Sequence, residues 1–330
     1  MNVASPDSTL DATRRGARSA ALIGTVRDYG IVVAFVALFA VLSLTSDVFF
    51  TTTNLLNILD QNAAVGTIAV GSTLVFIAGG FDLSVGAVYA ICGVVAAMTQ
   101  DELGTTGALA LGLLVGLSIG LANGLLTTVG RINPFIATLG SSIIIGGAAV
   151  AITGGAFITV QDEGFTELGR GGIGRATYGV ILWLAFALVC AVLLHMTRFG
   201  RHIFAAGGNA EAARLSGVRV NVVRTICYGL SGFSAALGGI LVVSRAGTAV
   251  PDAGGLSIAV LAVTAVVIGG TSILGGEGAV WRTVLGVLLL ALIGNGFNLL
   301  EVNPTYQDII RGGIILGAVA IDAWARKARA

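Results

Sequence analysis

The chain has 330 residues, of which 55% are hydrophobic and only 11% are charged, and its mean hydropathy is +0.95. A soluble protein usually carries about 25% charged residues, so the composition excludes an ordinary water-soluble domain. The 18 basic and 17 acidic side chains leave a net charge of +1, which excludes nucleic-acid binding through bulk positive charge. The sequence therefore predicts an all-α, polytopic membrane protein with little mass outside the bilayer.

Residues 1–28 are polar and contain scattered arginines. They lack the compact basic-then-apolar layout of a cleavable signal peptide, so we expect a cytoplasmic N-terminal tail. About ten apolar stretches follow, each close to the roughly 20 residues that a helix needs to cross the hydrocarbon core. They form a predicted transmembrane domain, residues 29–325, followed by a cytoplasmic tail at 326–330. The predicted spans are residues 29–45, 62–80, 83–99, 106–129, 134–153, 178–196, 221–244, 257–274, 280–299 and 306–325.

The distribution of arginine predicts the orientation of these spans. With ten spans and a cytoplasmic N-terminus, most of the basic residues fall in cytoplasmic segments, as the positive-inside rule requires. Both termini are therefore predicted to be cytoplasmic. The longest cytoplasmic loop is then residues 197–221, and the main periplasmic loop is residues 154–177. The number of spans stays open, because removing two adjacent spans would leave both termini on the same side.

Two further patterns predict local packing. Glycine occupies every fourth position from Gly112 to Gly124, which places these glycines on one helical face and predicts close helix packing. Residues 51–61 carry leucine and isoleucine on one helical face and asparagine, aspartate and glutamine on the other. We expect this stretch to lie at the outer membrane interface before the chain turns into the second span.

The residues that usually carry catalysis or bind metals are scarce. Cys92, Cys190 and Cys227 all fall in apolar stretches and are expected to be buried hydrophobic side chains. A phosphate-binding loop needs glycines and a lysine, and the only lysine is Lys327, at the C-terminal end. We therefore predict no catalytic residue, no metal site and no cofactor. If transport uses ATP, another subunit must hydrolyse it.

The cytoplasmic loop contains signals for a short, independent helix. Asn209 can cap its start, Glu211 favours the positive end of the helix dipole and Arg214 the negative end. Gly217 suits the position just after a helix. We predict a helix of about two turns at the membrane surface, which is either a connector bound to lipid headgroups or a docking element for a cytoplasmic partner.

Polar side chains within the spans are candidates for lining a translocation path. A buried serine or threonine often bonds back to its own helix, whereas asparagine is costlier in hydrocarbon, and Asn295 and Asn298 share one helical face. Asp82 is either a helix cap or a substrate contact. The spans lack ionisable residues at mid-membrane, which argues against a proton or sodium relay and favours a neutral solute. The predicted path residues are Asn62, Ser72, Asp82, Asn123, Thr138, Asn295 and Asn298, with Thr73, Ser141, Ser142 and Thr264 as further candidates.

Three segments resemble the signatures of a known family. They are residues 79–86 (GGFDLSVG), 133–140 (NPFIATLG) and 207–217 (GGNAEAARLSG), and residues 295–300 (NGFNLL) follow them in the right order. Together they identify the chain as similar to the ribose-type sugar ABC transporter permeases, over about residues 29–325. Phe81 departs from the isoleucine that is common in the family, but both side chains are apolar.

The resemblance implies the permease subunit of an ATP-driven importer in the bacterial inner membrane, which forms the path for a monosaccharide or similar polyol. It implies a homodimer, or a pair of related permeases, with two cytoplasmic ATP-binding subunits and a periplasmic sugar-binding protein. The loop helix would be the coupling helix that faces the ATPase. A branched-chain amino acid permease and a self-sufficient secondary transporter remain alternatives. The implied coupling residues are Asn209, Glu211, Ala212, Ala213, Arg214, Leu215 and Gly217.

Overall fold

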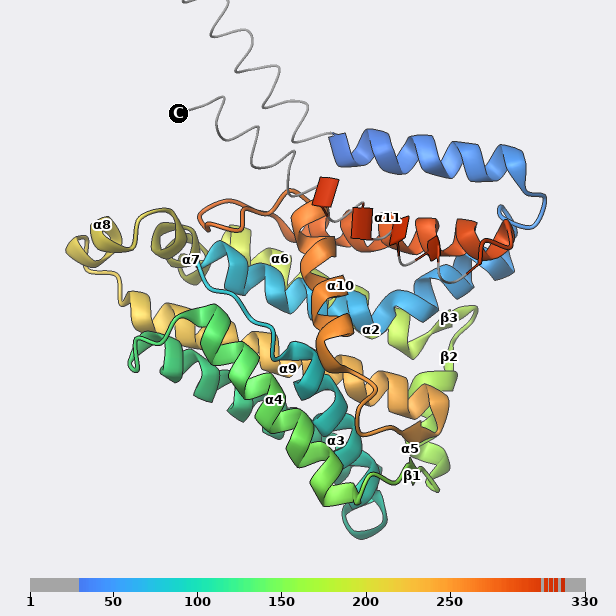
Figure 1. The fold of residues 1–330 in the computed structure, drawn as a ribbon, viewed down its shortest axis with the longest axis horizontal. Helices are drawn as coiled ribbons and strands as arrows, with labels where there is room; N and C mark the ends of the chain where they lie inside the picture. Colours follow the sequence, from blue (N-terminus) through green and yellow to red (C-terminus); the bar gives the residue numbers. More distant parts are fainter. Residues whose placement is uncertain (1–29, 304–305, 308, 311, 314–315, 318–330) are drawn as a thin grey trace, which may run out of the picture.

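The computed structural model describes residues 30–303, 306–307, 309–310, 312–313 and 316–317. The predicted tails at 1–28 and 326–330, and most of the last predicted span, lie outside the described residues. Helices dominate the rest of the chain (Figure 1). After a helix at Gly30–Thr45, they are α2 (Thr52–Ile77), α3 (Val85–Thr128), α4 (Pro134–Thr153), α5 (Glu163–Arg170), α6 (Tyr178–Met196), α7 (Arg198–Gly208), α8 (Ala210–Leu215), α9 (Val220–Ala246), α10 (Gly255–Ile268) and α11 (Val280–Leu299).

Several helices have the predicted bounds because local signals fix their ends. The helices α4, α6 and α11 coincide with the predicted spans 134–153, 178–196 and 280–299. At the start of α4, the side chain of Asn133 accepts a hydrogen bond from the backbone N–H of Phe135, and proline occupies the first turn. Both features are common at helix starts.

The long helix α3 is a hairpin of two arms. Gly104, with φ of 65° and ψ of 171°, interrupts the helical backbone, a conformation that glycine adopts readily. The second arm then folds back on the first, and Gly112 of the second arm lies close to the backbone of Cys92 and the side chain of Ala96 in the first arm. The two arms correspond to the predicted spans 83–99 and 106–129.

Some predicted boundaries were wrong. Residues 51–61 do not form a separate interfacial segment, because α2 runs without a break from Thr52 to Ile77. Helix α10 corresponds to the predicted span 257–274, but it ends at Ile268, because Gly270, with φ of 78°, turns the chain away from the helix axis. The loop predicted at 197–221 contains α7 in addition to the predicted short helix, which is α8.

The segment at 154–177 is structured rather than a solvated loop. It contains α5 and three short strands, β1 (Ile158–Thr159), β2 (Gly172–Ile173) and β3 (Ala176–Thr177). β1 pairs with β4 (Thr248–Ala249), and β2 pairs with β3, both antiparallel. Asp162 caps α5, and a hydrogen bond from Thr105 together with the N–H of Phe165 holds the pKa of its carboxyl below the usual value.

Length and composition agree with an all-α membrane protein that crosses the bilayer several times. In the described part of the chain, five helices are long and apolar enough to cross a membrane, namely α3, α4, α6, α9 and α11. Many of their outward side chains are large and apolar, as on α4, where Ile143 and Ile144 are exposed. A surface of this kind suits lipid rather than water. The three cysteines are buried free thiols, as predicted.

The centre of the fold is the packing of α9 against the second arm of α3. An ideal Cβ at Gly116 would lie 2.5 Å from the Ala236 side chain, and one at Gly120 would meet the carbonyl oxygen of Tyr228. These positions, with Gly112 and Gly124, form the predicted small-residue face. The two backbones therefore touch, as small residues allow in membrane helices.

This contact predicts a matched pair of stability effects. Gly120→Ala should destabilise the protein by about 1–3 kcal/mol, because the added methyl group collides with the α9 backbone. Gly147→Ala, on α4, should leave stability unchanged or raise it, because nothing lies within 4 Å of that position. The apparent Tm in detergent, followed by size-exclusion chromatography after heating, measures both. Equal Tm values for the two variants would contradict this packing.

Candidate functional site

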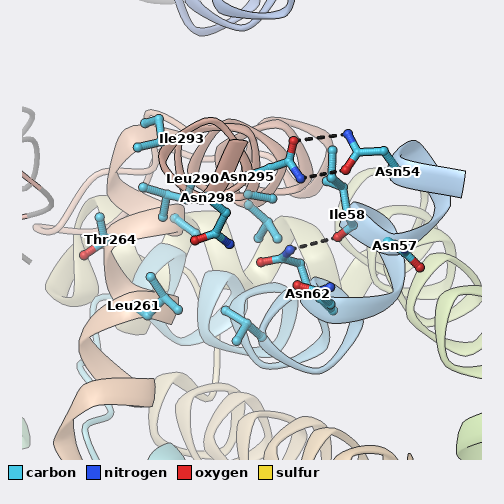
Figure 2. Close-up of a pocket in the computed structure, with 16 residues that line it drawn as sticks. Asn54, Asn57, Ile58, Asn62, Leu261, Thr264, Leu290, Ile293, Asn295 and Asn298 are labelled. Atoms are coloured by element: carbon cyan, nitrogen blue, oxygen red, sulfur yellow. Dashed lines mark hydrogen bonds between the residues drawn. The ribbon is translucent and has the colours of Figure 1, made fainter. Parts of the chain in front are cut away.

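A cavity of about 300 Å³ lies between α2, α10 and α11 (Figure 2). This volume is at the lower end of the range for small-molecule sites. The first half of α2 and the last half of α11 supply most of the wall, and α10 closes one side. Its polar side chains are Asn54, Asn57, Gln61, Asn62, Thr264, Asn295 and Asn298, and its apolar ones include Ile58, Val65, Leu261, Val287, Leu290 and Ile293.

Carboxamide groups dominate the polar part of this wall. A carboxamide both donates and accepts hydrogen bonds, as a sugar hydroxyl does. The lining residues that the structure describes include no charged side chain. Because an unpaired charge in such a site would be poorly solvated, the lining suits a neutral, multiply hydroxylated solute.

Two asparagines join α2 to α11 at the cavity. The Asn54 amide donates to the side-chain oxygen of Asn295 at 3.1 Å, and the Asn295 amide donates back to that of Asn54 at 2.8 Å. Figure 2 shows both bonds spanning from one helix to the other. The Asn62 amide donates to the carbonyl of Ile58 on its own helix. Asn62 and Asn298 point into the space between α2 and α11 (Figure 2).

Asp82 is the centre of a separate polar cluster that is almost fully buried. Its carboxylate accepts hydrogen bonds from the backbone N–H and the hydroxyl of Ser84, at 2.9 and 2.6 Å, and from the Ser231 hydroxyl at 2.9 Å. The Asn123 amide donates to the Ser84 hydroxyl at 2.8 Å. This network joins the loop before α3, the second arm of α3 and α9. Asp82 caps the Ser84 N–H at the start of α3.

The remaining predicted path residues also lie inside the helix bundle. The Thr138 hydroxyl accepts from the N–H of Leu83 at 3.1 Å and donates to the carbonyl of Pro134 at 2.8 Å. Ser72 is fully buried on α2, and its hydroxyl has no hydrogen-bond partner in the described part of the chain. The structure thus brings Asn62, Asn295 and Asn298 together and places Asp82, Asn123 and Thr138 in a second group.

Three residues of the cavity, Asn54, Asn57 and Gln61, were not among the predicted path residues. They belong to the polar face of residues 51–61, which we expected at the membrane interface. That polar face was the available signal. Because α2 is continuous, these three side chains lie on the same helix as Asn62 and line the cavity that faces α11.

The predicted short helix of the cytoplasmic loop is α8, which lies at the end of the molecule opposite to α5 (Figure 1). The Asn209 side chain accepts from the N–H of Ala212 at 3.0 Å, which confirms the predicted cap. Glu211 and Arg214 form an exposed pair at 3.4 Å. Of the predicted coupling residues, only Ala213 is buried, and the large apolar side chain of Leu215 is 82% exposed.

The Asp82 cluster predicts a structural effect of its removal. Asp82→Ala leaves the hydroxyls of Ser84 and Ser231 without their acceptor and should cost about 1–3 kcal/mol. The apparent Tm in detergent should fall, whereas Asn298→Ala, on the cavity wall, should leave it unchanged. An unchanged Tm in Asp82→Ala together with abolished transport would instead favour a direct role of Asp82 in the path.

Comparison with known proteins agrees with this architecture. The family described as "Branched-chain amino acid transport system / permease component" matches residues 54–319. The chain is 41% identical over 300 residues to the ribose import permease protein RbsC of Escherichia coli (strain K12), covering 88% of this chain and 92% of that protein.

Two other relatives are similar over comparable lengths. The ribose import permease protein RbsC of Bacillus subtilis (strain 168) is 40% identical, over 91% of this chain and 94% of its own. The galactose/methyl galactoside import permease protein MglC of Salmonella typhimurium (strain LT2) is 35% identical, over 92% and 96%. No solved structure gives a significant match. The chain therefore belongs to this permease family, in the group of ribose-type sugar ABC permeases that its sequence motifs indicate.

Proposed function

We propose that the chain is the membrane subunit of an ATP-driven importer and forms the translocation path for a monosaccharide or similar polyol. The observation that carries this proposal is the uncharged, carboxamide-lined cavity in a chain 41% identical to a ribose import permease. The relatives' names favour sugar import over branched-chain amino acid import. They also favour a permease of an ABC importer over a self-sufficient secondary transporter.

In this proposal the cavity residues replace part of the hydration of the sugar. Asn62, Asn295 and Asn298 offer donors and acceptors to hydroxyl groups, and the apolar wall beside them packs against the carbon face of the ring. None of these contacts is ionic, so the sugar is held weakly enough to leave. A path role for Ser72, Asp82, Asn123 and Thr138 stays a prediction, since these side chains are buried inside the helix bundle.

The energy source is proposed to lie in separate cytoplasmic subunits, two per transporter, that bind and hydrolyse ATP. Their contact on this chain is α8, through Asn209, Glu211, Ala212, Ala213, Arg214, Leu215 and Gly217. The exposure of Glu211, Arg214 and Leu215 supports this assignment, because these side chains are accessible to another subunit. ATP chemistry therefore takes place outside this subunit, which is itself non-catalytic.

We further propose the arrangement of the whole assembly. The arginine distribution supports cytoplasmic termini, and the relatives support a location in the bacterial inner membrane. Ten spans remain our prediction. A second copy of this chain, or a related permease, completes the membrane domain. A periplasmic binding protein delivers the sugar to the end that carries α5. The half of α2 that lines the cavity lies toward that end of the molecule (Figure 1).

Reconstitution tests the proposed function. The chain, the ATPase that copurifies with it from its native membrane and the corresponding binding protein are incorporated into liposomes. Sugar should accumulate only with ATP inside and the binding protein outside. Accumulation by the chain alone under an ion gradient would overturn the proposal. Uptake of leucine in place of sugar would favour the branched-chain amino acid alternative.

Removal of one cavity amide tests the path. Asn298→Leu should lower sugar uptake by about tenfold, since the loss of a hydrogen bond worth about 1.4 kcal/mol corresponds to that factor. ATPase activity stimulated by the binding protein should remain, because the ATPase contact is at the other end. Asn221→Leu makes the same change at an exposed position of α9, outside the cavity and outside the predicted coupling residues, and should transport as wild type does. Normal uptake by Asn298→Leu would remove this face from the path.

A charge reversal tests the coupling helix. Glu211→Lys should leave folding and membrane insertion intact, because the exposed pair with Arg214 contributes little stability. Uptake should be lost, since the ATPase meets a reversed charge at its docking site. Arg131→Glu, an exposed reversal between α3 and α4 that lies outside the predicted coupling residues, serves as the control and should transport normally. Unchanged uptake and unchanged ATPase stimulation in Glu211→Lys would exclude this role.

A further inference from the structure

Five glycines bring three segments into direct backbone contact beside α8. Gly79 follows α2, Gly207 and Gly208 end α7, and Gly275 and Gly276 lie in the loop between α10 and α11. We call these five residues the glycine junction. The N–H of Gly276 donates to the carbonyl of Ile77, the last residue of α2, at 2.9 Å.

The junction leaves no room for side chains between its three segments. An ideal Cβ at Gly275 would lie 2.8 Å from the Cα of Gly79, and one at Gly276 would lie 2.6 Å from the Cα of Gly208. One at Gly207 would collide with the carbonyl oxygen of Ile77. Since packed backbones resist deformation, a displacement of the α7 end moves the α2 end with it.

Arg224, in the first turns of α9, forms hydrogen bonds to the C-terminal ends of both α2 and α7. Its Nε donates to the carbonyl of Ala78 at 2.9 Å, and one terminal nitrogen donates to the carbonyl of Ala206 at 3.1 Å. Ala78 is the C-cap of α2, and Ala206 lies in the last turn of α7. Carbonyls at helix ends lack partners within the helix, and a cation beside them is stabilised by the helix dipoles. A single guanidinium therefore bridges two helices.

The position of this bridge connects the two proposed sites of the chain. The chain passes from Gly208 through Asn209 directly into α8, so a movement of α8 acts on the junction without an intervening linker. At the other side, α2 runs from Ile77 back to Asn54 at the cavity, a distance of about 35 Å at the rise of an α-helix. The loop of the junction likewise leads into α11, which forms the facing cavity wall.

We propose that Arg224 and the glycine junction form the mechanical link through which α8 moves the cavity helices α2 and α11. Arg224 is a positioning residue in this scheme. It touches neither the sugar nor the ATPase, and it keeps the ends of α2 and α7 in one rigid body. When the ATPase displaces α8, that body carries the displacement to the cavity. The inference rests on the proposed function, because it needs an ATPase that acts on α8.

Arg224→Ala tests the link in the reconstituted transporter. The variant should assemble with the ATPase and hydrolyse ATP, but the sugar transported per ATP should fall by about tenfold, within the usual range for coupling between two sites. Arg224→Lys keeps the charge and can reach one carbonyl at a time, so its ratio should be intermediate. If Arg224→Ala does not fold, a lowered ratio of sugar transported to ATP hydrolysed in the folded Arg224→Lys variant would support the link, and a wild-type ratio would contradict it. Arg201→Ala, on an exposed face of α7, should keep the wild-type ratio.

Two outcomes would overturn the proposal. A wild-type ratio of sugar to ATP in folded Arg224→Ala would exclude a transmitting role. Equal losses of uptake and ATP hydrolysis, together with a lower Tm, would reduce Arg224 to a residue that only stabilises the fold. If the wild-type protein itself shows no ATP-driven uptake, the proposed function fails rather than this inference.

A measurement on the purified permease alone separates the inference further from the proposed function. Hydrogen exchange in detergent should become faster in Arg224→Ala at residues 205–216 and 76–80, because the two helix ends lose their bridge. Exchange in α5, at the opposite end, should not change. Unchanged exchange at the junction would contradict the link even if transport were impaired.

Discussion

The structure depends on the close approach of α9 to the second arm of α3. Glycine at positions 116, 120 and 124 lets the two backbones touch, which larger residues would prevent. This contact brings Ser231 of α9 to the Asp82 carboxylate, and Asn123 of α3 to the same cluster. These hydrogen bonds offset part of the cost of burying the carboxyl group. The α3–α9 packing and the Asp82 cluster therefore stabilise one another, and together they hold α9 in place as the scaffold of the fold.

Against this scaffold, α2 carries different chemistry at its two ends. At its start, carboxamides face α11 around an uncharged cavity. At its end, the backbone meets Gly207 and Gly276 and receives the Arg224 guanidinium. The first end has side chains that can exchange partners with a solute, whereas the second has tightly packed backbone. A helix with an adaptable end and a rigid end is suited to convert a movement at α8 into a change at the cavity.

Local rules predicted most of the helices. The bounds of α4, α6 and α11 followed from apolar length, caps and glycines, and the Asn209 cap of α8 is set by residues within one turn. Prediction failed where long-range packing decides. The continuity of α2 and the presence of α5 depend on neighbours distant in the sequence. Phe165 of α5, for example, is buried beside α9, although its own segment reads as a polar loop.

The sequence by itself determined that this is an α-helical membrane permease, because apolar length, sparse charge and four short motifs are local properties of the chain. It also singled out Asn62, Asn295 and Asn298, since an amide within a span is conspicuous. Only the tertiary structure decided that these three meet Asn54 in one cavity while Asp82 and Asn123 join Ser84 and Ser231 in a separate buried cluster. It alone placed Arg224 between two helix ends. The physical reason is that both arrangements depend on which helices pack together, and helix contacts join residues far apart in the chain.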